Sequence, residues 1–426
     1  MLQIQLIREV RVLRKICKEG RGSNMEVLQV PLPHSKKGPY KGNFWPIFVK
    51  DMEKLAKGPC GSLAEETILK YINRTTDTVK AGGSERMNYS LKELPNLKIM
   101  LEKQFSPELF AFVAQCALRL PDLFPSGTIP CLERKKPGRV ELSRLQVGCL
   151  LTHMFFCTIL PNKDVEKTHC GHFTGARAPT GPLTFINWLA RDGDGIGGWV
   201  SQCGPTYIYL STLLIYFRDL MSMEEARLQE KIVFERLVSD TKDRGWDPQG
   251  SSVSILEVEV HLNGRIGDIE QVEMDFANKH VGFGTTGTQE ELLLGTSPES
   301  CVIVLFNEVL EAHEAVLMTG ARRYGEYSGY GRTAAFSGPC SAAWDWPRRR
   351  ILALDAIAGP RNQLGDVTMM RELAKAWTGL AAVRGSSVST GHWGCGAFGG
   401  DPYIKCLVQV CYTVLNTISV NKLFHR

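Results

Sequence analysis

The feature that most constrains the fold is an alternation of short apolar runs with amphipathic stretches, which begins near residue 230. Runs rich in β-branched and apolar residues predict strands at 232–234, 253–262, 272–277, 301–305, 315–319, 351–357 and Ser387–Thr390. Apolar residues at helical spacing predict helices at 306–313, 368–380 and 402–415. Alternating strands and helices favour an α/β domain in which helices cover a mixed sheet.

The first half of the chain has the pattern of a helical domain. Ser106 and Pro107 form a favourable N-cap and first-turn pair, and apolar residues follow at helical spacing until Pro121 ends the run. Similar helices are predicted at 63–72 and 142–156, and a buried helix or strand at 207–217. We therefore expect a basic N-terminal segment at 1–30, a mainly helical accessory domain at 31–215, and the α/β domain at 216–426.

The composition is that of a globular protein and excludes a disordered, collagen-like or coiled-coil chain. Of the 426 residues, 43% are hydrophobic and 22% are charged. The net charge of +5 is too small for this length to require nucleic acid, but it suits a ligand rich in phosphate. The longest uncharged stretch, 195–217, contains several glycines and a proline, so we expect no membrane span.

Cysteine use indicates a reducing compartment, because the 13 cysteines include no CxxC pair and form no dense framework. One group of possible metal ligands lies close together in the sequence: His153, Cys157, His169, Cys170 and His172. Its spacing matches no common zinc pattern. We interpret it as a helical His/Cys pair followed by a polar loop, and we expect no metal.

The N-terminal segment has two interpretations. Residues 1–18 alternate apolar and basic side chains, which is typical of an amphipathic targeting helix. Glu9 and Glu19 argue against a transit peptide, since such peptides are poor in acids, and Met25 is an alternative start. A solvated basic helix is the second interpretation, and mitochondrial targeting is the less favoured of the two.

Polar residues gather where the strand predicted at 272–277 ends. Asp275 and Asn278 lie there, followed by the turn Gly282-Phe283-Gly284 and then by Gln289-Glu290-Glu291. A glycine turn lets the backbone approach a ligand, and the paired carboxyl groups supply a candidate acid and base. Composition alone also allows a surface turn with solvated acidic residues.

A second polar cluster follows the strand Ser387–Thr390. Residues 391–401 contain five glycines and lead into the helix predicted at 402–415, an arrangement that favours a phosphate group. A long turn without a ligand is the alternative. Tyr324, Tyr327 and Tyr330 form a third cluster, which could stack on a base or sugar or simply pack their loop.

These clusters together resemble the poly(ADP-ribose) glycohydrolase family. The family signature, a glycine run and a spacer before Gln-Glu-Glu, is similar to MDFANKHVGFGTTGTQEE at residues 274–291. Two further motifs of the family follow in order, as TGARRYGEYSGY at 319–330 and TGHWGCGAFGGD at 390–401. The resemblance covers about 218–409 and extends more weakly, through Phe155-Phe156-Cys157, back to roughly residue 60.

The resemblance implies a macrodomain, a three-layer α/β/α sandwich, preceded by a helical accessory domain. It implies that Glu291 is the catalytic acid, which protonates the departing ribose 2′-oxygen and then deprotonates water. It implies that Glu290 and Asn278 hold the terminal ribose, supported by Asp275 and Gln289. A partly desolvated carboxyl group beside another should also have a raised pKa, which suits a general acid.

The remaining ligand contacts also come from the resemblance. The implied substrate-binding residues around the ribose, diphosphate and adenine are Gly282, Gly284, Gly396, Ala397, Phe398, Tyr327, Ile266 and Asp268. Gly396, Ala397 and Phe398 would wrap the diphosphate, and Tyr327 would lie beside the adenine and phosphates. Asp268, in the segment near Ile266, is the acidic residue expected to receive the adenine amino group.

Three departures from the family pattern bear on catalysis. Phe283 replaces the middle glycine, and the spacer before Gln289 has four residues, about three fewer than usual, so the acids could be displaced. His392 replaces an asparagine. The family continues past the position of Arg426 through a strand with a second adenine-stacking phenylalanine, for which Phe424 is the candidate here.

Three functions therefore stand side by side. The first is a glycohydrolase that cleaves the ribose–ribose bonds of poly(ADP-ribose) and releases ADP-ribose, with no cofactor. The second is a macrodomain that binds ADP-ribose or its polymer and hydrolyses it poorly, and the third is an interaction protein with a vestigial sugar site. The expected partners are poly(ADP-ribose) and ADP-ribosylated proteins, with no membrane or nucleic-acid duplex. A monomer in the nucleus and cytoplasm, acting in the DNA damage response, is expected.

Overall fold

A computed structural model describes most of the chain between residues 27 and 424. The described residues are 27–36, 40, 42–57, 61–79, 94–103, 105–159, 184–189, 204–239, 258–261, 264–268, 272–342, 345–359, 363–416 and 419–424. The segment 1–18, the residues His169, Cys170 and His172, and part of the strand predicted at 253–262 lie outside them.

The first half of the described chain is mainly helical, as the sequence predicts. The helices are α2 (Phe44–Leu55), α3 (Gly61–Val79), α4 (Pro95–Lys103), α5 (Pro107–Leu118), α6 (Leu120–Leu123), α7 (Arg144–Phe155), α9 (Ile186–Leu189), α10 (Pro205–Ser222) and α11 (Glu225–Leu228). Ser106 caps α5, where its hydroxyl accepts a hydrogen bond of 3.2 Å from the Leu109 amide. As predicted, this helix ends before Pro121, with Leu118 as its last residue. Pro121 lies in the first turn of the separate short helix α6, where its missing N–H costs nothing.

An eight-stranded mixed sheet forms the centre of the molecule, in the order β3-β4-β7-β10-β6-β11-β12-β5. The strands are β3 (Gly138–Ser143), β4 (Lys231–Val238), β5 (Val258–His261), β6 (Val272–Asp275), β7 (Glu314–Thr319), β10 (Arg350–Ala353), β11 (Ser387–Thr390) and β12 (Ser419–Phe424). Pairing from β3 through β10 is antiparallel, whereas β10, β6, β11, β12 and β5 run parallel. Two-stranded sheets pair β1 (Gln29–Pro31) with β2 (Thr128–Pro130) and β8 (Gly325–Ser328) with β9 (Ala335–Pro339).

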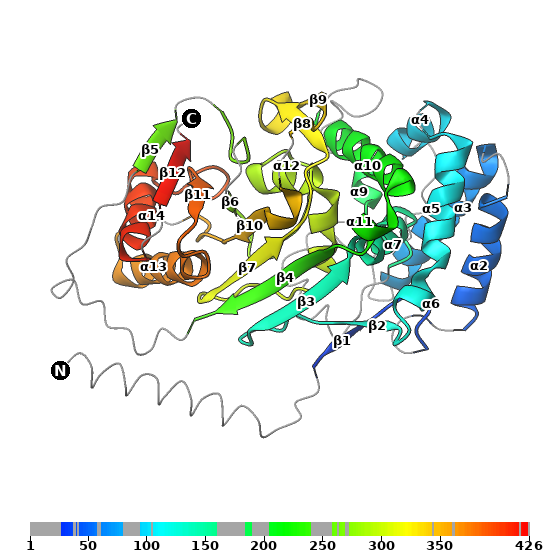
Figure 1. The fold of residues 1–426 in the computed structure, drawn as a ribbon, viewed down its shortest axis with the longest axis horizontal. Helices are drawn as coiled ribbons and strands as arrows, with labels where there is room; N and C mark the ends of the chain where they lie inside the picture. The colour runs from blue at the N-terminus through cyan, green and yellow to red at the C-terminus, as the bar shows by residue number, and fades with distance from the viewer. Residues whose placement is uncertain are drawn as a thin grey trace.

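Helices cover both faces of this sheet. Alternate residues of a strand point to opposite faces, and in β7 Val316 and Met318 join one apolar cluster while Ala315 and Leu317 join the other. The first cluster includes α7, α10 and α12 (Gln289–Gly295), and the second includes α13 (Asp366–Ala381) and α14 (Pro402–Asn416). Figure 1 shows α13 and α14 at one end of the molecule and α2 to α5 at the other. The structure therefore has the predicted three-layer α/β/α arrangement.

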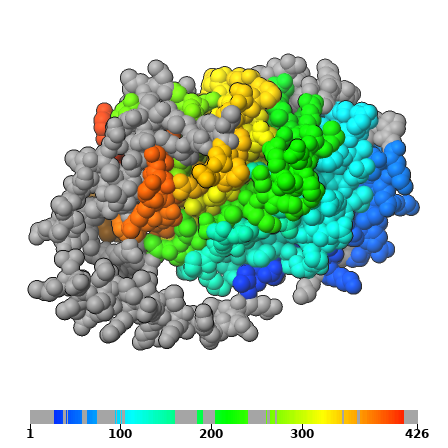
Figure 2. Space-filling view, viewed as in Figure 1, coloured from blue at the N-terminus to red at the C-terminus, as the bar shows by residue number. Residues whose placement is uncertain are grey.

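The helical part and the sheet share one apolar core. The larger cluster runs without interruption from Val30 in β1, through the helices, to Ala353 in β10. Figure 2 shows α10, in green, packed between the blue and cyan helices and the yellow hairpin of β8 and β9. The boundary predicted at 215/216 falls inside α10, and β3, from the part predicted to be helical, is the outermost strand of the sheet.

Two adjacent predictions are wrong. Residues 301–305 were expected to be a strand, but Pro298–Leu305 is a 3₁₀-helix whose residues are all buried. Pro298 starts its first turn, and the Ser300 hydroxyl and amide both donate to the Ser297 carbonyl. Residues 306–313, predicted to be helical, form an extended connection whose amides donate elsewhere, such as Leu310 to the Lys279 carbonyl at 2.8 Å.

The other elements of the second half lie close to their predicted positions. β6, β7, β11, α13 and α14 match within a few residues, and residues 207–217 belong to the buried helix α10. The strand expected at 351–357 is limited to Arg350–Ala353. Among the described residues, no helix is both long enough and apolar enough to cross a membrane.

Candidate active site

The polar clusters of the sequence meet at one edge of the sheet. Asp275 is the last residue of β6, and Thr390 is the last residue of β11, the parallel neighbour of β6. Because the carboxyl ends of parallel strands share an edge, the acidic loop after β6 and the glycine-rich loop after β11 leave the sheet side by side. The carboxyl ends of the strands are the edge at which open α/β sheets bind their ligands.

Asp275 and Glu290 form a buried acidic pair beneath this edge. Asp275 is fully buried, and neither of its carboxylate oxygens has a hydrogen-bond partner in the described part of the chain. Burial raises the pKa of Asp275 to about 8. Burial and the nearby charge of Asp275 also hold the pKa of Glu290 well above its ordinary value.

Glu290 is anchored by backbone amides on both of its carboxylate oxygens. Oε2 accepts from the Asn278 amide at 2.9 Å, and Oε1 accepts from the Gly282 amide at 3.0 Å. Both hydrogen bonds lower its pKa and oppose the effect of burial. Glu290 therefore ties the first turn of α12 to the loop that precedes it, and the exposed side chain of Asn278 lies beside it.

Glu291 caps its own helix through only one of its two oxygens. Thr288 is the N-cap of α12 and Glu291 is the third residue of the helix, which makes a capping box. Oε2 accepts from the Thr288 amide and hydroxyl at 3.0 and 2.9 Å, and from the amide and hydroxyl of Thr286. No described residue donates a hydrogen bond to Oε1, so this oxygen is still able to accept one from a ligand.

Gly284 lies directly against that second oxygen. A Cβ atom on Gly284 would lie 2.0 Å from Oε1 of Glu291, closer than any real contact. Glycine is therefore required here by close approach, since its φ angle is not in the left-handed region. At Gly282 a Cβ would lie 2.7 Å from Val304 Cγ1, which is also too close unless that side chain shifts.

Phe283, which takes the place of the middle glycine, packs into the apolar core that the helical part and the sheet share. Its φ angle is outside the left-handed region, and its buried ring packs against the stacked pair of Phe185 and Trp188, with ring centroids 5.1 and 5.0 Å away. The indole nitrogen of Trp188 also donates to the Gly284 carbonyl at 2.8 Å. The ring of Phe283 and the hydrogen bond from Trp188 thus anchor the short loop to the helical part of the molecule.

Gln289 holds the helix to the strand. Its Oε1 accepts from the Phe276 amide at 2.8 Å, and its Nε2 donates to the Met274 carbonyl at 3.0 Å. Both polar atoms of the side chain are used by the backbone around Asp275. This geometry fits the supporting role expected for Gln289.

The glycine-rich loop offers unused amide groups. The amides of Gly396, Ala397 and Phe398 donate to no described protein atom, whereas the Phe398 carbonyl accepts from the Gly359 amide at 2.8 Å. Neighbouring turns are closed by hydrogen bonds, including Gly400 to the Gly394 carbonyl at 2.8 Å. Successive free amides in a turn form a concavity that binds oxyanions, so the loop can hold the predicted diphosphate.

Arg265 brings three of the predicted adenine-side residues together. Its guanidinium lies 4.5 Å from the ring centre of Tyr327 in β8 and donates to the Tyr327 carbonyl. Its amide donates to Asp268 at 2.7 Å, and its guanidinium pairs with Asp268 at 3.1 Å. Ile266 lies between them in the same turn. Arg265 itself was not identified from the sequence.

Tyr330 bridges the acidic and glycine-rich loops, although it was not assigned to the site from the sequence. A Cβ on Gly396 would lie 3.6 Å from its hydroxyl oxygen. Burial and the charge of Glu291 raise the pKa of Tyr330. The Gly331 amide also donates to the Gly287 carbonyl at 2.8 Å, which joins the acidic loop to the segment that follows β8. In the sequence, the signal for this role was the cluster of Tyr324, Tyr327 and Tyr330.

The described residues hold no group of three or more side chains suited to a metal ion. His153 is buried in α7, where Nδ1 lies 2.8 Å from the Thr158 hydroxyl and Nε2 lies 3.0 Å from the Ala117 carbonyl. Burial lowers its pKa to about 3. His153 is therefore a neutral core residue whose two nitrogens both have protein partners.

Comparison with known proteins agrees with this geometry. The model of the poly(ADP-ribose) glycohydrolase macro domain fold matches residues 246–420, and that of the helical domain of the same family matches residues 98–236. The chain is 23% identical to the probable poly(ADP-ribose) glycohydrolase 2 of Arabidopsis thaliana, over 86% of this chain and 82% of the relative. It is 24% identical to poly(ADP-ribose) glycohydrolase 1 of the same plant, over 86% and 81%.

An animal relative shows the same similarity. Poly(ADP-ribose) glycohydrolase 1 of Caenorhabditis elegans is 28% identical, over 78% of this chain and 41% of the relative. The two family models together match most of the chain, with the helical domain first and the macro domain fold after it. The chain therefore belongs to the poly(ADP-ribose) glycohydrolase family.

Proposed function

We propose that this protein is a glycosidase that hydrolyses the ribose–ribose O-glycosidic bonds of poly(ADP-ribose) and releases ADP-ribose. Membership of the family supports the reaction class. The observation that carries the finer proposal is the position of Glu291, with one carboxylate oxygen held by the threonine loop and the other open against Gly284. A carboxyl group held in this way can exchange a proton at a single defined point.

In the proposed reaction Glu291 acts as acid and then as base. Its Oε1 proton passes to the departing ribose 2′-oxygen as the bond between that oxygen and the anomeric carbon breaks. Water then adds to the anomeric carbon of the oxocarbenium-like sugar, and the proton that this water loses returns to Glu291. The products are ADP-ribose and a polymer that is one unit shorter.

The neighbouring residues hold the sugar and reduce the negative charge of the site. In the proposal Glu290 and Asn278 bind the hydroxyl groups of the terminal ribose, supported by the hydrogen bond between them and by the contact of Gln289 with the backbone next to Asp275. Because burial raises the pKa of both Asp275 and Glu290, this pair retains a proton near neutral pH. That proton weakens the repulsion between the acids and the substrate diphosphate.

The rest of the ADP-ribose unit would follow the glycine-rich loop. The free amides of Gly396, Ala397 and Phe398 suit the diphosphate, and Tyr327 and Asp268 suit the adenosine end. These remote contacts supply binding energy that positions the anomeric carbon near Glu291.

The test is the release of free ADP-ribose from purified polymer by the full-length protein. A hydrolase produces ADP-ribose over many turnovers, in proportion to enzyme and time. A protein that binds ADP-ribose or polymer in equilibrium measurements without releasing product is a reader, and the proposal of hydrolysis is then wrong. Absence of both binding and release would overturn the assignment of the whole site.

A further inference from the structure

A second polar pocket lies at the far end of β10 from the acidic loop. It has a volume of about 470 Å³, and its walls include Arg144, Arg227, Glu230, Arg322, Asp345 and Trp346. Trp346 precedes the first residue of β10, whereas the last residue of that strand, Ala353, is paired with Asp275. The strand therefore separates this pocket from the acidic pair by about 10 Å or more of sheet.

One of the three arginines in the pocket is fully engaged by protein groups. Arg144 is buried and donates to both oxygens of Glu299 at 2.7 and 2.6 Å. It also donates to Glu230 at 2.8 Å and to the Gly320 carbonyl at 2.9 Å. Arg144 therefore forms the rigid floor of the pocket and has little left for a ligand.

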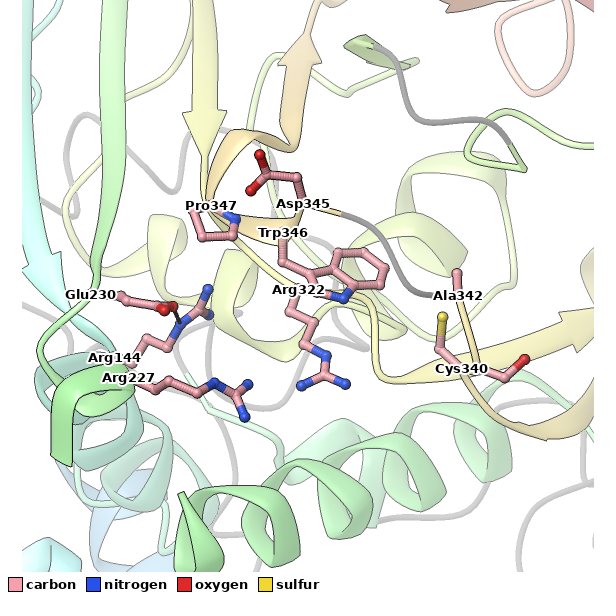
Figure 3. Close-up of a pocket in the computed structure, with 10 residues that line it drawn as sticks. Arg144, Arg227, Glu230, Arg322, Cys340, Ala342, Asp345, Trp346 and Pro347 are labelled. Carbon is pink, nitrogen blue, oxygen red and sulfur yellow. Dashed lines mark hydrogen bonds and ion pairs between the residues drawn. The ribbon is translucent and has the colours of Figure 1, made fainter. Parts of the chain in front are cut away.

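The other two arginines are only partly compensated. Arg227 and Arg322 share one carboxylate, that of Asp219, at 3.9 and 3.5 Å. The Nε of Arg322 has no hydrogen-bond partner in the described part of the chain. Figure 3 shows the two side chains approaching from different directions, with their guanidinium groups directed toward the same part of the pocket. Among the described residues, Asp219 is the only carboxylate within 4.0 Å of either guanidinium group, so both arginines keep donors that an anion can use.

The surrounding residues hold this cationic pair in place. The Arg322 guanidinium lies 5.2 Å from the ring centre of Tyr324 and 5.8 Å from that of Trp346, so aromatic faces fix its position. Asp345 is paired with the exposed Arg348 at 3.1 Å. Glu230 and Asp345 also place carboxylate oxygens on the wall, where they can accept hydrogen bonds from hydroxyl groups.

We propose that this pocket binds a diphosphate and its adjoining ribose from poly(ADP-ribose), at a distance from the bond that is cleaved. One guanidinium group can donate two parallel hydrogen bonds to the oxygens of one phosphate group. Two adjacent guanidinium groups therefore suit the two linked phosphates of a diphosphate. The volume falls within the range of small-ligand sites. The inference rests on the proposed function, because that substrate repeats the diphosphate in every unit.

A second site changes how long polymers bind. When one unit occupies the acidic site, further units of the same chain are at a high effective concentration near the pocket, provided that the chain can span the distance. Long polymers therefore gain affinity that a two-unit substrate cannot gain. The pocket selects for polymer length without contacting the reacting atoms.

The experiment compares Arg227→Gln with wild type on long polymer and on a two-unit substrate. The side chain of Arg227 is 40% exposed, so its replacement leaves the fold intact. Arg139→Gln is the matched control, because it removes the same charge from a side chain that is 52% exposed and that neither lines the pocket nor pairs with a residue that does. The KM for long polymer should rise about tenfold in Arg227→Gln alone, with kcat and the two-unit kinetics unchanged.

Other outcomes overturn the proposal. An unchanged KM for long polymer, an equal effect on the two-unit substrate, or an equal effect of Arg139→Gln would each contradict a polymer site. Equilibrium binding of labelled polymer is measured on the same proteins at two salt concentrations. If the wild type releases no ADP-ribose, hydrolysis fails, while a binding difference confined to Arg227→Gln still supports the pocket. Equal polymer binding by wild type and Arg227→Gln rejects the pocket.

Discussion

A single methyl group at Gly284 would collide with the carboxylate of Glu291. The added Cβ would lie 2.0 Å from Oε1, so either the side chain or the loop must move. We predict that Gly284→Ala lowers kcat by about 100-fold or more, the effect of removing a general acid, while the protein stays folded. Gly138→Ala is the control. Its Cβ would meet only the end of the Leu132 side chain, at 3.1 Å, and turnover should be retained. Full activity of Gly284→Ala would show that Oε1 is not the reacting oxygen.

The buried carboxyl of Asp275 makes the stability of the protein depend on pH. Its pKa is raised from 3.8 to about 8, so the folded protein holds this proton more tightly than the unfolded chain does. Its contribution to the free energy of unfolding is fully present below about pH 4 and is lost as the pH rises through 8. We predict that wild type loses stability relative to Asp275→Asn between pH 5 and 8, as measured by urea unfolding. A difference that does not change with pH would contradict this prediction.

At the scale of elements, the shortened loop depends on an aromatic anchor. Phe283 packs against the stacked rings of Phe185 and Trp188, and the Trp188 indole also donates to the Gly284 carbonyl at 2.8 Å. We predict that Trp188→Phe, which retains an aromatic ring and loses this hydrogen bond, costs about 1 kcal/mol of stability and also lowers kcat. Trp377→Phe is the control, because that residue belongs to α13 and packs against the other apolar cluster. Equal losses of kcat in both variants would argue against the anchor.

The sequence predicts those elements whose signals are local. The cap at Ser106 and the amphipathic patterns of α13 and α14 place these helices correctly. The run at 301–305 misleads because a short apolar stretch is equally consistent with a buried strand or helix. Hydrogen bonding around Ser297 and Ser300, which residue periodicity does not reveal, decides in favour of a 3₁₀-helix.

The candidate site shows the same difference between features that are local in the sequence and features that depend on tertiary contacts. The acids, glycines and tyrosines were found because each motif is continuous in the sequence. The anchoring of Gly284 by Trp188 joins residues 96 positions apart, and the roles of Arg265 and Tyr330 also arise only from tertiary contacts. The sequence therefore indicated that Phe283 departs from the pattern, while the fold explains how the loop accommodates it.

On the scale of the whole molecule, the helical part acts as a support for the catalytic edge. One apolar core runs from the first described strand to β10, and the aromatic residues that hold Phe283 come from α9 and the residue before it. The arginine pocket lies at the opposite end of β10, so one sheet can carry two contacts with a single long substrate. In this arrangement the sheet fixes the distance between the arginine pocket and the acidic residues at the proposed site of cleavage.

The central claim is that Glu291 carries the proton transfer, and the most direct measurement is ADP-ribose release by Glu291→Gln beside wild type. Glutamine keeps the shape of the side chain but cannot donate or accept the catalytic proton. Glu141→Gln, at an exposed glutamate on the outermost strand, is the matched control. We predict that kcat falls by about 100-fold or more in Glu291→Gln alone, with ADP-ribose binding retained. Turnover close to that of wild type in Glu291→Gln would contradict the assignment of this residue as the acid.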